Sequence, residues 1–198
     1  MADFGAVILA GGRATRLGGV DKPGLEVGGR TLLAAVVAAV QDAGAGRTVV
    51  VGPERPRMPV RFVREEPAGA GPFAALRRGL AELPPDGASR VAVLAADLPF
   101  LRAGHVRTLL EAARSRSGAV LVDADGCPQW LTGCWQTRSL RAAAAAYTGV
   151  SLRGLMRPLD PALVLIEPGP AEPPPWLDCD TGSDLRRARD WPVPRSAR

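Results

Sequence analysis

Short apolar runs alternate with longer segments of helical spacing along the first two thirds of the chain. The apolar runs lie at residues 6–9, 48–51, 60–63, 91–95 and 119–122. They are continuous rather than alternating, which is typical of strands buried on both faces of a sheet. Helices are predicted over 32–44, with Thr31 as cap and Gly44 as end, over a segment ending at Leu83, and over 103–115.

This alternation of strands and helices predicts right-handed crossovers. We therefore expect an α/β fold, a Rossmann-like three-layer α/β/α sandwich with a mostly parallel central sheet. Beyond Asp123 the pattern changes. The later elements are an extended segment (126–135), a helix (138–147), a short helix (151–159), a strand (162–166), a Pro-rich surface loop (169–175) and a final helix capped by Ser183. A single domain is expected over 1–191, with its two halves meeting near residue 123 and a disordered tail over 192–198.

Length and composition indicate a soluble globular protein. The chain has 198 residues and 46% hydrophobic residues, and no apolar run reaches the roughly eighteen residues that a membrane span needs. The first residues run directly into a strand without a signal-peptide layout, so a cytoplasmic location and no membrane partner are expected. The three cysteines, Cys127, Cys134 and Cys179, show no C-x-x-C spacing and are predicted to be free thiols.

The net charge of +5 does not indicate a nucleic-acid partner. The arginines are scattered among acidic residues, and no basic run carries interleaved aromatic residues. Attraction of small polyanions explains the positive charge equally well.

A glycine-rich loop follows the first buried strand. Gly11 and Gly12 let the backbone approach a ligand closely, and Arg13, Arg16 and Lys22 suit an anion such as a phosphate chain. Lys22 is the only lysine beside 24 arginines, which indicates a position that needs a compact ammonium group. Taken alone, a Gly-Gly pair after a strand is more often a simple turn.

Acidic residues follow two further strands, at the edge where open α/β sheets bind ligands. Asp97 comes directly after the run at 91–95, and Glu65 and Glu66 come after the run at 60–63. A carboxylate at the end of a buried strand needs a partner, and Mg²⁺ shared with substrate phosphates is a suitable one. Capping of the following loop is the alternative role for Asp97.

Four segments together resemble one family. The segment LAGGRATRLGGVDK is similar to the Leu-Ala-Gly-Gly-x-x-x-Arg-Met/Leu-Gly-x-Asp-Lys loop of the nucleotidyltransferases related to the molybdenum cofactor guanylyltransferase. REEPAGAGPFAAL, ADLPFL and DCDTGSDL resemble later motifs of the same family, so the likeness spans residues 6 to 190. Glu65 stands where the family commonly has an aspartate, and Gly52-Pro53 where it often has an asparagine.

The resemblance implies a role for each matched residue. Arg16 and Lys22 would bind the triphosphate and, with Asp97, form the catalytic set. Asp97 would hold Mg²⁺, and Asp180 is either a second Mg²⁺ ligand or an acidic residue favoured at a helix N-terminus. The nucleotide-binding set would comprise Leu9, Ala10, Gly11, Gly12, Arg16, Lys22, Glu65, Gly71 and Asp97.

The resemblance also implies substrates. LAGG and GPFAAL favour GTP, bound by residues 1–123, and the resemblance implies molybdopterin as the acceptor, bound by residues 124–191. CTP, a sugar or polyol phosphate acceptor, and a non-catalytic nucleotide-binding module remain alternatives. Transient contact with molybdoenzymes or cofactor-biosynthesis proteins is expected. Acceptor candidates are Gln129, Trp130, Trp135, Ser151, Arg153 and Arg157, although core packing is the favoured role for both tryptophans. His105 is predicted to be a surface residue without a role.

Overall fold

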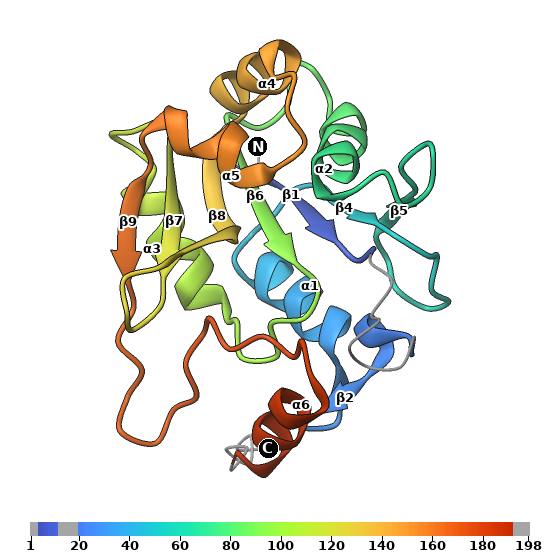
Figure 1. Ribbon diagram of the computed structural model, residues 1–198, viewed down its shortest axis with the longest axis vertical. Helices are drawn as coiled ribbons and strands as arrows, with labels where there is room; N and C mark the ends of the chain where they lie inside the picture. Colours follow the sequence, from blue (N-terminus) through green and yellow to red (C-terminus); the bar gives the residue numbers. More distant parts are fainter. Residues whose placement is uncertain (1–3, 12–19, 192–198) are drawn as a thin grey trace.

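The computed structural model describes residues 4–11 and 20–191. Within them, seven strands form one sheet in the order β5-β4-β1-β6-β8-β7-β9 (Figure 1). These strands are β1 (Phe4–Leu9), β4 (Thr48–Val51), β5 (Arg61–Val63), β6 (Arg90–Ala95), β7 (Gly118–Val122), β8 (Pro128–Gln136) and β9 (Ala162–Leu165). β8 runs antiparallel to β6 and β7, and the other pairings are parallel. The predicted mostly parallel sheet is therefore confirmed.

Helices cover both faces of this sheet. The helices are η2 (Lys22–Gly24), α1 (Leu32–Asp42), α2 (Pro72–Ala81), α3 (Ala103–Ala112), α4 (Thr137–Ala146), α5 (Leu152–Met156), η3 (Arg157–Leu159) and α6 (Gly182–Asp190). α1 and α3 share one buried cluster with alternate residues of β1 and β6, and α2, α4 and α5 share a second cluster with the residues between them. The three layers expected from the sequence are thus present.

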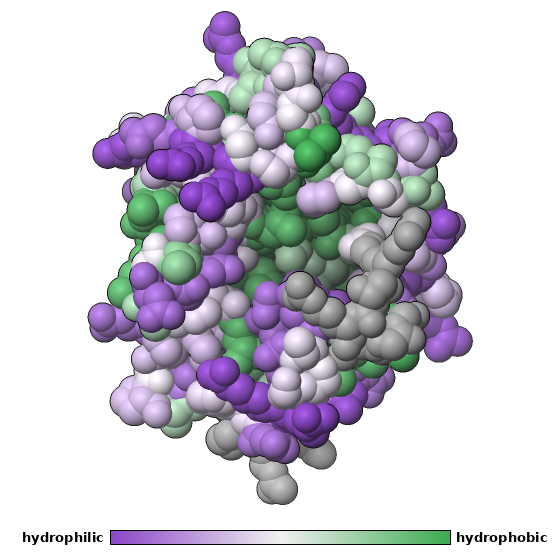
Figure 2. Space-filling view, in the orientation of Figure 1, coloured by the Kyte–Doolittle hydropathy of each residue, from purple (hydrophilic) through white to green (hydrophobic). Residues whose placement is uncertain are grey.

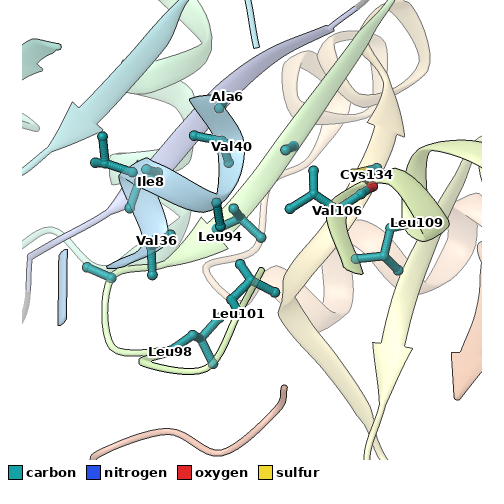
Figure 3. Close-up of a cluster of buried hydrophobic side chains, with 14 of the residues drawn as sticks. Ala6, Ile8, Val36, Val40, Leu94, Leu98, Leu101, Val106, Leu109 and Cys134 are labelled. Carbon is teal, nitrogen blue, oxygen red and sulfur yellow. Dashed lines mark hydrogen bonds between the residues drawn. The ribbon is translucent and has the colours of Figure 1, made fainter. Parts of the chain in front are cut away.

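Figure 3 shows how the first of these clusters is built. Val36 and Val40 of α1 lie against Ile8 of β1, and Val106 of α3 lies beside Cys134 of β8. Ile8, Val36, Val40, Val106 and Cys134 are all completely buried. Apolar side chains spaced for a helix meet the continuous apolar run of a strand, which is the pattern that predicted this layer.

A smaller third cluster joins α6 to a two-stranded hairpin. The hairpin, β2 (Glu26–Val27) and β3 (Arg30–Thr31), was not predicted from the sequence. Val27 of β2 and Leu185 of α6 are buried in this cluster, and Figure 1 shows the two elements side by side. Nε of Arg189 also donates a hydrogen bond to the backbone oxygen of Glu26, at 2.9 Å. The end of the described chain is therefore held beside the segment that follows β1.

The helix ends follow the predicted signals in part. Oγ1 of Thr31 accepts a hydrogen bond from the backbone N–H of Ala34 at 3.2 Å, and Gly44 has φ +99°, so both predicted ends of α1 are confirmed. The predicted cap of the last helix was wrong: α6 begins after Thr181, not Ser183. Cys127, Cys134 and Cys179 are free thiols, as expected. No helix among the described residues is both long and apolar enough to span a membrane.

Candidate active site at the carboxyl ends of the strands

Three predicted site residues meet at one point. Nζ of Lys22 donates hydrogen bonds to Oδ2 of Asp97 and, at 2.5 Å, to Oδ1 of Asp180. The side chains of Lys22 and Asp97 are each 16% exposed, and that of Asp180 is 48% exposed. A single ammonium group therefore links segments 75 and 158 residues away along the chain.

The fold explains why these residues meet. β1 and β6 are parallel neighbours, so the segments that follow them emerge at the same edge of the sheet. Lys22 comes from the first segment, and Asp97 lies two residues after the end of β6. Packing of α6 on the hairpin adds Asp180, which directly precedes the helix cap.

Burial and charge act against each other at Lys22. Burial alone would lower the pKa of Lys22, but the carboxylates of Asp97 and Asp180 outweigh it and the pKa is raised. For Asp178, burial and the negative charges of Asp180 and Asp97 raise the pKa to about 6. Burial, followed by the charge of Asp97, raises the pKa of the Cys179 thiol to about 12, so this thiol is a poor nucleophile.

The carboxylates fit a magnesium ion. Oδ1 of Asp97 is buried and has no hydrogen-bond partner among the described residues. Within that part of the chain, no cluster of three or more metal-ligating side chains forms a complete metal site. Mg²⁺ commonly binds through one or two carboxylates together with substrate phosphates and water, so Asp97 with Asp180 matches the donor set that this ion uses.

A second group of predicted residues gathers at the ends of β1 and β5. A Cβ atom placed on Gly11 would lie 3.8 Å from Oε1 of Glu65. The same carboxylate oxygen accepts a hydrogen bond from the backbone N–H of Gly69 at 2.9 Å. Gly71, with φ +97°, lies two residues later and is the N-cap of α2. The structure thus brings Gly11 and Glu65 together beside the start of a helix.

The backbone around Ala10 is closely packed. The N–H of Ala10 donates to the backbone oxygen of Val51 at 2.8 Å, and the oxygen of Leu9 accepts from Ala96 at 3.1 Å. Both groups already make hydrogen bonds within the protein. Gly11, which is exposed, is therefore the better candidate for a ligand contact. Gly52 lies so close that a Cβ there would be 2.9 Å from the oxygen of Ala10. A side chain at position 52 would therefore clash with the backbone of Ala10.

Two members of the predicted nucleotide-binding set, Gly12 and Arg16, lie outside the described residues. So do Arg13 and the predicted tail over 192–198. Their assigned roles remain predictions from the sequence.

The acceptor candidates of the second half are dispersed. Nε2 of Gln129 donates to Oδ2 of Asp123 at 3.0 Å, so this side chain joins the two ends of the turn between β7 and β8. Oγ of Ser151 accepts from the N–H of Gly154 at 3.0 Å and caps α5. Arg153 and Arg157 are exposed. None of these contacts involves Lys22, Asp97 or Asp180.

The two tryptophans pack against the core, as favoured from the sequence. Trp135 is completely buried, and its Nε1 has no hydrogen-bond partner among the described residues. Trp130 is half-buried against the same cluster. Figure 2 shows a hollow with an apolar floor over the middle of the sheet, and hydrophilic residues lie to its left and below it. This face of the molecule therefore offers an apolar surface next to polar groups.

Three residues have contacts or charges that the sequence did not predict. Arg55 holds Asp21, the neighbour of Lys22, through two hydrogen bonds. Asp178 was available as the first acidic residue of the DCDTGSDL motif. His105 has a structural role, since its Nδ1 accepts a hydrogen bond from the backbone N–H of Arg102 at 3.2 Å, at the start of α3.

A mostly parallel α/β sheet with charged residues gathered at its carboxyl edge is the arrangement in which open α/β proteins bind ligands such as nucleotides. Residues 6–163 match the profile of the MobA-like NTP transferase domain. The chain belongs to this family.

Individual relatives agree with this assignment. A probable molybdenum cofactor guanylyltransferase from Opitutus terrae is 39% identical over 122 residues, and the match spans 60% of each chain. A protein of the same description from Mycobacterium avium is 32% identical over 69% of this chain and 73% of its own. Among solved structures, a nucleotidyl transferase from Methanothermobacter superposes with a TM-score of 0.77 at 24% identity, covering 94% of this chain and 96% of that one. This last likeness concerns the fold.

Proposed function

We propose that this protein is a molybdenum cofactor guanylyltransferase, which transfers GMP from GTP to molybdopterin and releases pyrophosphate. The observation that carries the proposal is the meeting of Lys22, Asp97 and Asp180 at the carboxyl edge of the sheet. The Opitutus and Mycobacterium relatives, which bear this description, support the choice of substrates. The reaction would take place in the cytoplasm, and transient contact with molybdoenzymes would deliver the product.

The chemistry demands charge neutralisation more than covalent participation. In transfer of a nucleotidyl group, a phosphate oxygen of the acceptor attacks the α-phosphorus, and the bond to the β-phosphate oxygen breaks. The attacking oxygen is already anionic, so no general base is needed. Lys22 would stabilise the negative charge that develops on the departing pyrophosphate, and Arg16, which the sequence motif assigns to the triphosphate, would add a second positive charge.

Asp97 and Asp180 would hold Mg²⁺. When bound, the ion would supply positive charge to phosphate oxygens of both substrates. In the free protein, Lys22 occupies these carboxylates. The ammonium group would then turn from these carboxylate oxygens toward phosphate oxygens of the bound nucleotide. The remaining nucleotide contacts would come from exposed Gly11 and from the loop that joins Glu65 to Gly71.

The test is pyrophosphate release with Mg²⁺ and each of the four nucleoside triphosphates, with and without molybdopterin. Release that requires both GTP and molybdopterin is the expected result. Release with CTP would identify CTP, not GTP, as the nucleotide substrate. Release with a sugar or polyol phosphate in place of molybdopterin would identify that compound as the acceptor. Tight binding of GTP without release under any of these conditions would make the protein a nucleotide-binding module instead.

A further inference from the structure

Arg55, which belongs to none of the sequence motifs, binds the side chain of Asp21, the residue before Lys22. Nη1 of Arg55 donates to Oδ2 of Asp21 at 2.7 Å, and Nη2 donates to Oδ1 at 2.5 Å. The Arg55 side chain is only 18% exposed, and its Nε has no hydrogen-bond partner among the described residues. This paired geometry fixes both the distance and the orientation of the carboxylate.

The order of the strands explains where the Arg55–Asp21 pair lies relative to Lys22. Arg55 lies between β4 and β5, whereas Asp97 follows β6, and β1 lies between β4 and β6 in the sheet. The turn that carries Lys22 follows β1. Arg55 therefore holds this turn from one side, while Asp97 and Asp180 receive the ammonium group on the other.

The turn is also shaped to accept the guanidinium group. The backbone N–H of Gly24 donates to the oxygen of Asp21 at 3.0 Å, and Leu25 donates to the oxygen of Lys22 at 3.0 Å. A Cβ atom on Gly24 would lie 3.0 Å from Nη1 of Arg55 and would press against the Asp21 carboxylate. Glycine at this position leaves room for the pair to lie directly over the turn.

We propose that Arg55 is a positioning residue, which fixes the turn at Asp21 so that Lys22 is held where the triphosphate binds. The inference rests on the proposed function, because it assumes that Lys22 acts on that substrate. Arg55 touches neither substrate in this scheme. Its effect passes through Asp21 and the backbone of the turn.

Lys22 is the only lysine in the chain, and this allows a direct test that needs no nucleotide. The rate at which acetic anhydride acylates Lys22 can be followed by mass spectrometry of the peptide that contains it. In the wild type, hydrogen bonds from Nζ to Asp97 and Asp180 hold the amine against the protein and limit its access to the reagent. Arg55→Ala and Gly24→Ala are expected to increase this rate severalfold, and Arg55→Lys to increase it less.

Arg116→Ala is the matched control. It removes a surface ion pair with Asp160 of similar length, 2.6 Å, and leaves the Lys22 turn intact. Its acylation rate should equal that of the wild type. Should Arg55→Ala fail to fold, as judged by circular dichroism, Arg55→Lys and Gly24→Ala carry the test. Wild-type acylation rates in folded Arg55 and Gly24 variants would overturn the inference.

Kinetics separate positioning from direct substrate contact. Arg55→Ala is expected to lower kcat by about tenfold or more, since misplacement of a catalytic group by about 1 Å can cost 10²-fold. A rise in KM for GTP with unchanged kcat would instead indicate that Arg55 binds the nucleotide, and would overturn the inference. If the wild type releases no pyrophosphate, the proposed function fails, while the acylation rates still decide whether Arg55 positions Lys22.

Discussion

Lys22 is the residue at which the described segments of the site converge. A compact ammonium group reaches two carboxylates at once, whereas a guanidinium group is planar and wider. The chain uses arginine at its 24 other permanently cationic positions, so lysine here reflects a requirement of shape rather than of charge alone.

Lys22→Arg is therefore expected to fold normally but to lower the rate of pyrophosphate release at least about tenfold. Lys22→Ala and Asp97→Ala are expected to lower this rate about 10²–10³-fold or more, which is typical for removal of an electrostatic contact in an active site. Thermal melts checked by circular dichroism should show folded proteins in all three cases. Wild-type turnover in Lys22→Arg would show that charge alone suffices at this position.

Residue by residue, the sequence predicted only part of the site. Lys22, Asp97 and Asp180 could be selected because each lies in a recognisable segment, and the structure joins them. Arg55 could not be selected, because one arginine among many in a Pro-containing loop carries no local signal. Its function depends on β4 lying next to β1, a fact of topology rather than of local pattern.

Among the elements, α6 shows how two adjacent signals compete. Thr181 and Ser183 are both good capping residues, and the sequence alone favoured Ser183. In the structure, Oγ1 of Thr181 accepts from the N–H of Asp184 at 3.2 Å, and Oδ2 of Asp184 accepts from the N–H of Thr181 at 2.8 Å. This reciprocal capping box decides where the helix begins.

Thr181→Ala should consequently lower the free energy of unfolding by about 1 kcal/mol, the typical cost of losing a helix cap. Ser183→Ala is the control, and it should change stability by less because Ser183 lies inside the helix. Urea unfolding followed by circular dichroism measures both. A larger loss for Ser183→Ala would place the cap at the position first predicted.

At α3, His105 is expected to make the stability of the fold depend on pH. Burial, followed by the positive charge of Arg102, lowers the pKa of His105 below its usual value. The neutral ring accepts a hydrogen bond from the N–H of Arg102, and protonation of Nδ1 would remove that acceptor. Because the unfolded chain binds this proton more readily, the stabilising effect is complete above about pH 6.5 and is lost as pH falls through the lowered pKa.

His105→Gln removes this titration while keeping an acceptor at the third helical position. We expect stability of the variant to depend less on pH between about 5 and 7 than that of the wild type. Urea unfolding at several pH values provides the comparison. Parallel pH profiles for the two proteins would exclude His105 as the source.

Across the whole molecule, the two predicted halves are interleaved rather than stacked. β8, from the second half, lies between β6 and β7 of the first half. The cluster under α2, α4 and α5 likewise combines Val7 and Val93 with Trp135 and Leu140. Continuous apolar runs predicted the individual strands, but the insertion of an antiparallel strand between two parallel ones depends on long-range pairing that local pattern does not encode.

This interleaving predicts that residues 1–191 unfold as one unit. Loss of β8 would remove the partner of both β6 and β7, so neither half retains a complete sheet. Calorimetry should therefore give a single transition whose calorimetric and van't Hoff enthalpies agree, and tryptophan fluorescence should follow the same curve as far-ultraviolet circular dichroism. Two separated transitions would mean that residues 1–123 and 124–191, the proposed nucleotide and acceptor halves, fold independently, and acceptor specificity would then be transferable with residues 124–191 alone.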